Sequence, residues 1–111
     1  MDKQEAMEQL KEFAEKVQLG TLSIEASNPY ISKSYLWDWE HTVVDAVKAL
    51  TQKDAEEAAY NKEIADALKS VAMSIHKGTL KIMRGNHADA DELKVAILAV
   101  LLGAAKQLER R

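Results

Sequence analysis

Three residues near the middle of the chain, Asp38, His41 and Asp45, are of types that bind divalent metals or act as general acids and bases. They lie in a segment whose apolar residues recur every three or four positions, which predicts a helix over about 32–50. At the spacing i, i+3, i+7 the three side chains share one helix face. Two carboxylates beside an imidazole could hold a metal ion or tune the histidine as a general base. Asp38, His41 and Asp45 are therefore a candidate metal site.

The simpler interpretation of this face is a solvated one with local ion pairing, because it lies opposite the apolar stripe of the same helix. A second acidic pair, Glu63 and Asp66, has i, i+3 spacing on the next predicted helix. These helix-borne Asp, Glu and His side chains support an alternative function, that of a metal-dependent or acid/base enzyme. We assign no catalytic residue and no cofactor, because the chain has no nucleophile motif, phosphate-binding glycine loop or Cys/His zinc spacing.

Aromatic residues are concentrated just before and inside the same helix. Four of the six in the chain, Tyr30, Tyr35, Trp37 and Trp39, lie within ten positions. Trp39 falls on the apolar stripe and is expected in the core, whereas Trp37 projects away from it. Tyr and Trp are enriched where proteins bind partners, because they combine a large rigid contact area with a polar group. We therefore predict partner binding at Tyr30, Tyr35 and Trp37; the alternative is that residues 21–33 fold back over Trp37.

Four helices are predicted to account for most of the chain. Each carries apolar residues at spacings of three and four, the pattern of a helix with one buried face. Gly20 and Gly78 are expected to end the first and third, because glycine accepts the left-handed conformation of a helix C-terminus. The predicted helices span residues 3–19, 32–50, 55–77 and 90–109. Four helices with short to moderate connections predict one all-α domain over 1–111, an antiparallel four-helix bundle.

The last predicted helix is apolar on nearly every side. No charged residue occurs between Lys94 and Lys106, yet this stretch is about half of the ~20 residues that a membrane span needs. Such a helix is buried on most sides, so a second copy of the chain, or a connector, must cover the side that faces out of the bundle. We therefore predict a homodimer through this helix. The predicted interface residues are Val95, Leu98, Ala99 and Leu102.

One string occurs twice in the chain. Residues 20–24 read Gly-Thr-Leu-Ser-Ile and residues 78–82 read Gly-Thr-Leu-Lys-Ile, each directly after a predicted helix. As a true repeat, the string predicts two αα-hairpin halves related by an approximate twofold. The two Thr-Leu-x-Ile segments are then expected to meet, as a short two-stranded ribbon or as paired single turns. The alternative is chance similarity between helical sequences.

Composition narrows the class of protein. The 111 residues suit one domain with its own core, and the absence of Cys excludes disulfides and thiolate chemistry. A net charge of −3 gives no general attraction to nucleic acid or anionic membranes. The N-terminal segment contains no apolar signal core, so we expect a cytoplasmic protein. We predict a small non-enzymatic helical protein, acting as an adaptor, inhibitor or immunity-type regulator, whose partners are itself and an unidentified protein.

Overall fold

The computed structural model describes residues 2–27, 30–51, 58–84 and 91–109. The helices are α1 (Lys3–Gln18), α2 (Lys33–Thr51), α3 (Ala58–His76) and α4 (Asp91–Glu109), and the strands are β1 (Leu22–Ala26) and β2 (Leu80–Arg84). The ends of α1 and α2, and the C-terminal ends of α3 and α4, lie within one residue of the predicted positions. The predicted starts of the third and fourth helices, at residues 55 and 90, lie outside the described residues.

The described chain is mostly helical, with four helices, and it also contains two short strands that form a small sheet. Each strand lies in a connector between two helices, within residues 21–33 or within residues 79–88. In each connector leucine and isoleucine alternate with more polar residues, which turns the apolar side chains toward one face of a strand. The backbone N–H and C=O groups of each strand then form hydrogen bonds with the strand in the other connector.

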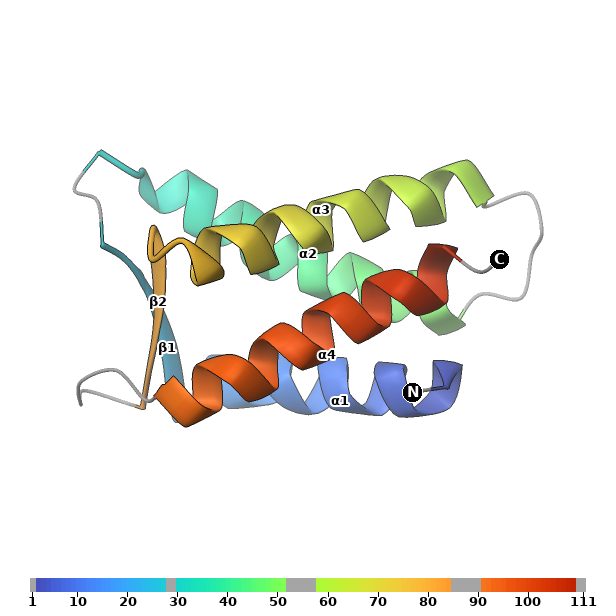
Figure 1. The fold of residues 1–111 in the computed structure, drawn as a ribbon, viewed down its shortest axis with the longest axis horizontal. Coiled ribbons are helices and arrows are strands. Elements are labelled where there is room, and N and C mark those ends of the chain that lie inside the picture. The colour runs from blue at the N-terminus through green and yellow to red at the C-terminus, as the bar shows by residue number, and fades with distance from the viewer. Residues whose placement is uncertain (1, 28–29, 52–57, 85–90, 110–111) are drawn as a thin grey trace.

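The helices pack around a shared core with a ribbon across one end (Figure 1). α1 and α3 run in one direction, and α2 and α4 run in the other. α1 packs against α2 and α4, and α3 packs against the same two helices. The ribbon of β1 and β2 lies at the end where α1 and α3 finish. In this view α4 is in front and α2 is behind, so these two helices lie on opposite sides of the molecule.

The core draws side chains from all four helices and from the ribbon. Its fully buried large apolar residues are Leu10, Val43, Leu50, Leu68, Ile75, Leu80, Ile82, Leu101 and Leu108. Trp39 packs edge-on against Phe13, with ring centroids 5.4 Å apart and an angle of 88° between the rings. This geometry stabilises an aromatic pair beyond the area that it buries. Trp39 is therefore a core residue, and it fastens α2 to α1.

Both connectors begin with the same turn. Gly20 and Gly78 have φ angles of 76° and 84°, which a residue without a Cβ adopts at little cost. The following residue, Thr21 or Thr79, donates hydrogen bonds from its backbone N–H and from its hydroxyl to a carbonyl near the end of the preceding helix. These bonds occupy carbonyl groups that have no partner within the helix. The Gly-Thr pair thus ends the preceding helix at both places, α1 at Gly20-Thr21 and α3 at Gly78-Thr79.

The ribbon has a symmetric register. β1 and β2 pair antiparallel with Ile24 directly opposite Ile82, and these two residues hold the same position in the repeated string. Leu22 pairs with Arg84 at one end of the ribbon, and its counterpart Leu80 pairs with Ala26 at the other end. The ribbon is therefore symmetric about a point between the two isoleucines. This is the meeting of the two segments that a true repeat predicts, in the form of a two-stranded ribbon.

Candidate functional site

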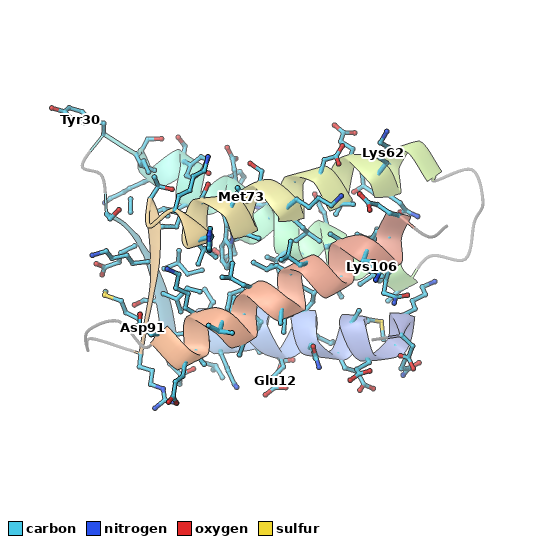
Figure 2. All side chains as sticks on the ribbon, in the orientation of Figure 1. Glu12, Tyr30, Lys62, Met73, Asp91 and Lys106 are labelled. Atoms are coloured by element: carbon cyan, nitrogen blue, oxygen red, sulfur yellow. The ribbon has the colours of Figure 1, made fainter. Side chains whose placement is uncertain are left out.

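Two of the aromatic side chains predicted to bind a partner are strongly exposed. Tyr30 is 91% exposed and Trp37 is 61% exposed. Tyr30 projects away from the body of the molecule just before α2 (Figure 2). Asn28 and Pro29, which precede it, lie outside the described residues. The part of the 21–33 segment that is described leaves most of the Trp37 side chain uncovered.

The exposed Trp37 ring is held by its own helix. Its centroid lies 3.8 Å from the centroid of the His41 ring, with the two planes inclined by 60°. The contact follows from the spacing i, i+4, which places the two side chains one turn apart on the same face. A large ring that is already restrained loses less conformational entropy when a partner binds it than a free one does. His41 therefore restrains the exposed ring of Trp37.

Tyr35, unlike Trp37, is anchored to another helix. Its hydroxyl oxygen lies 3.1 Å from the hydroxyl of Ser74 on α3, within hydrogen-bonding distance. The carbonyl of Ser74 also accepts the hydrogen bonds of Thr79 that end α3. The side chain of Tyr35 thus ties the first turn of α2 to the end of α3 and leaves only about a third of its surface in water. Its expected role is to position the start of α2, while Trp37 and Tyr30 present the open aromatic surface.

A hollow of about 390 Å³ adjoins Trp37. Its lining comes from α1, β1 and α2 and consists of Val17, Ile24, Lys33, Leu36, Trp37, Trp39 and Glu40. Most of these side chains are apolar, with the ammonium group of Lys33 and the carboxylate of Glu40 as the charged members. The hollow has the size and character to accept one large apolar side chain of a partner. We call Tyr30, Trp37 and this hollow the aromatic surface.

The predicted metal site does not assemble into a ligand cluster. Asp38 and His41 are exposed and Asp45 is half-buried, while His41 packs on Trp37. Among the residues that the structure describes, no group of three or more His, Asp and Glu side chains comes close enough to hold a metal ion. Metal binding by Asp38, His41 and Asp45 stays a prediction, and the geometry gives His41 another role.

The acidic pair Glu63 and Asp66 lies on the exposed face of α3. Asp66 lies near Lys69, and Lys69 donates a hydrogen bond to Glu109 at the end of α4. This hydrogen bond, together with the negative charges of Glu109 and Asp66, raises the pKa of Lys69 above its ordinary value. The sequence did not indicate this link, because it joins residues of two helices. Asp66, but not Glu63, thus belongs with Glu109 to the acidic groups around Lys69.

The outward face of α4 is apolar, as the sequence predicted. Val95 is 68% exposed, Leu102 is 48% exposed, Ala99 is exposed and Leu98 is half-buried. Asp91 at the start of the helix and Lys106 near its end are both exposed and are labelled in Figure 2. We call Val95, Leu98, Ala99 and Leu102 the α4 face. No described segment covers this face, so the alternative of a covering connector is not seen in the described part of the chain.

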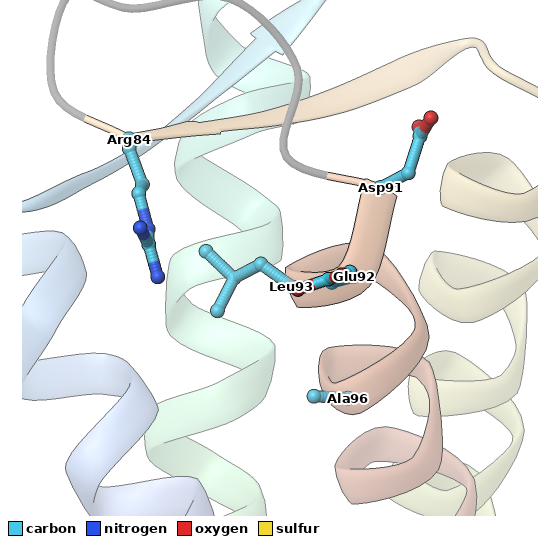
Figure 3. Close-up of a pocket in the computed structure, with 5 residues that line it drawn as sticks. All are labelled: Arg84, Asp91, Glu92, Leu93 and Ala96. Atoms are coloured by element: carbon cyan, nitrogen blue, oxygen red, sulfur yellow. The ribbon is translucent and has the colours of Figure 1, made fainter.

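A second hollow, of about 460 Å³, opens between the end of β2 and the first turns of α4 (Figure 3). It is lined by Arg84, Asp91, Glu92, Leu93 and Ala96. The two acids lie in the first turn of α4, where the helix dipole favours negative charge. Residues 85–90, which join the two sides of the hollow, lie outside the described residues. We assign no ligand to it.

Comparison of the chain with family models, with curated proteins and with solved structures gives no match. No helix among the described residues is long and apolar enough to cross a membrane. The candidate sites therefore rest on the geometry of this chain alone.

Proposed function

We propose that this protein is a non-enzymatic interaction module that forms a homodimer through the α4 face and binds another protein through the aromatic surface. The observation that carries the proposal is the exposure of large apolar side chains on two helices, at Trp37 on α2 and at Val95 and Leu102 on α4. Large apolar side chains left in water, where several share one face as on α4 or adjoin a hollow as at Trp37, are features of sites of protein association. An adaptor, an inhibitor or an immunity-type regulator would use such a pair of surfaces.

Trp37 and Val95 are the same number of residues apart as Gly20 and Gly78. They therefore occupy corresponding positions in the two copies of the repeat. Both side chains lie in the second turn of the helix that follows a connector, and both are mostly exposed. α2 and α4 lie on opposite sides of the molecule (Figure 1). A dimer formed through α4 would therefore leave both copies of the aromatic surface free for other partners.

The aromatic surface has the features of an energetic centre in a protein interface. Trp and Tyr dominate such centres, and their rings are most effective beside a pocket from which water is excluded. Trp37 lies at the edge of the hollow, and Ile24 and Leu36 supply apolar walls. Lys33 and Glu40 offer one charge of each sign to polar groups of a partner. The fitting partner is a protein that inserts an apolar side chain into the hollow and covers the ring of Trp37.

The test of partner binding uses two variants that each remove an exposed apolar side chain. Trp37→Ala removes the aromatic surface, and Met73→Ala removes a half-exposed side chain on α3 as the control. Proteins captured by the wild type are identified, and their affinities for the purified variants are measured. We expect at least a tenfold loss of affinity for Trp37→Ala and little change for Met73→Ala. Equal affinities for wild type and Trp37→Ala would exclude the aromatic surface as the binding site.

The test of self-association is the molar mass in solution, measured by light scattering over a dilution series. The expected result is a dimer that dissociates on dilution, with Leu102→Glu monomeric at concentrations where the wild type is dimeric. Trp37→Ala serves as the control here, because it lies on the other side of the molecule. A wild type that is monomeric at every concentration would contradict the dimer and would leave the aromatic surface to be judged by the binding test.

A further inference from the structure

We propose that two copies of α4 pair antiparallel across a twofold, with Asp91 of each copy facing Lys106 of the other. This inference rests on the proposed homodimer and adds to it the direction and register of the two helices. It is carried by the order of residues along the outward face of α4. Asp91 lies at one end of this face, Lys106 lies near the other end, and the apolar residues of the α4 face lie between them.

The face is self-complementary about one point. Val95 and Leu102 are two turns apart, and the point midway between them falls between Leu98 and Ala99. Turning a second α4 by 180° about that point places Val95 against the partner's Leu102 and Leu98 against the partner's Ala99. Each large side chain then meets a partner position of suitable size, and the small Ala99 makes room for Leu98. A face with this property suits the isologous contact of a symmetric dimer.

The same rotation brings Asp91 opposite the partner's Lys106. Asp91 and Lys106 are separated by about 22 Å along the helix axis, and they lie near the line of Val95 and Leu102 on the helix surface. Neither has an ion-pair partner within the described part of the chain. In the antiparallel pair each carboxylate meets an ammonium group at the rim of the apolar contact. A parallel pair would instead set Lys106 against Lys106 and Asp91 against Asp91, so the charges select the antiparallel direction.

The internal repeat explains why this association stops at two copies. The positions of α2 that correspond to Leu98 and Ala99 of α4 are Glu40 and His41. Two equivalent apolar faces on opposite sides of one molecule would let copies join without closing, as an open chain. A carboxylate and an imidazole at the centre of the α2 face prevent the same apolar contact there, because burying them would leave charged or polar groups without partners. The α4 face alone is apolar throughout, and its pairing closes as a dimer.

The experiment uses charge reversal at the two ends of the face. Asp91→Lys gives a chain with a lysine at both ends, and Lys106→Glu gives a chain with an acid at both ends. Each variant alone would bring like charges together twice in its antiparallel dimer, and we expect its dissociation constant to rise about tenfold at low salt. An equimolar mixture of the two variants restores opposite charges at both ends. We expect the mixture to form a heterodimer of wild-type affinity, measured by analytical ultracentrifugation with one variant fluorescently labelled.

The outcomes separate this inference from the homodimer itself. Weakened single variants whose mixture dimerises like the wild type would support the antiparallel register. A mixture no tighter than the single variants, in a protein whose wild type still dimerises and whose Leu102→Glu variant does not, would overturn the register and keep the α4 interface. A wild type that does not dimerise would overturn both. Circular dichroism of each variant, at exposed positions that leave the core untouched, checks that the fold is retained.

Discussion

Leu101 and Leu102 provide a direct test of how α4 is oriented. They are neighbours of the same type in the same helix, but Leu101 is fully buried and Leu102 is 48% exposed. Replacing either by alanine changes helix propensity by the same small amount. The difference between the two variants therefore measures burial. Leu101→Ala is expected to destabilise the protein strongly and Leu102→Ala only slightly.

The magnitude follows from the atoms that are removed. Leu101→Ala deletes three buried carbon atoms, which is worth about 2.4 kcal/mol of transfer free energy at about 0.8 kcal/mol each. The cavity that remains adds to this, and we expect a total loss of about 3–4 kcal/mol in the free energy of unfolding. For a domain of this length that loss lowers the melting temperature by about 15 °C. Leu102→Ala should cost less than about 1 kcal/mol, because much of its side chain is in water already.

The assay is urea unfolding followed by circular dichroism, with thermal melting as a second measurement. Both variants are compared in dilute solution, because dimer formation would add a concentration-dependent stability to the chain that keeps Leu102. An unchanged dependence on urea shows that the variants unfold from the same compact state. Equal losses for the two variants, or a loss below about 1 kcal/mol for Leu101→Ala, would refute the inward placement of Leu101.

Three further predictions concern the ends of helices. Asp2→Ala removes the carboxylate that accepts a 2.8 Å hydrogen bond from the backbone N–H of Glu5, and thermal melting should show a loss of about 1 kcal/mol. Gly78→Ala meets no neighbouring atom but forces a Cβ into a left-handed conformation, so the same assay should show a loss of about 1–2 kcal/mol. The hydrogen bond to Glu109 raises the pKa of Lys69, so it stabilises the fold below the ordinary lysine pKa and is lost as pH rises through the raised value. An NMR titration should therefore find a lower pKa for Lys69 in the Glu109→Gln variant than in the wild type.

The helices were predictable because their signals are local. Apolar spacing marks the buried face, and Gly20 and Gly78 end α1 and α3 through a backbone conformation that few other residues adopt. The strands were harder to predict, since each has five residues and only short alternation. Their pairing depends on a segment far along the chain, and the repeated string was the one signal that linked the two. A ribbon and paired single turns were both compatible with that signal.

The candidate site was predictable only in part, for a related reason. Periodicity along α2 separated Trp39, which is buried, from Trp37, which is exposed. The packing of Trp37 on His41 follows from their spacing of four residues and could have been read from the sequence. The hollow beside Trp37 could not, because Val17 and Ile24 come from two other elements. Contacts between elements far apart in the chain require the tertiary structure.

The repeat also bears on how the two proposed surfaces relate to each other. Trp37 and Val95 are counterparts in the repeat, so one position of the aromatic surface corresponds to one position of the α4 face. A symmetric scaffold offers that place twice, and the residues at it decide what it binds. On α4 an uncharged apolar face suits a second identical copy, whereas on α2 a restrained tryptophan among charged groups suits a different protein. In this proposal, self-association and partner binding are two uses of one position in a duplicated fold.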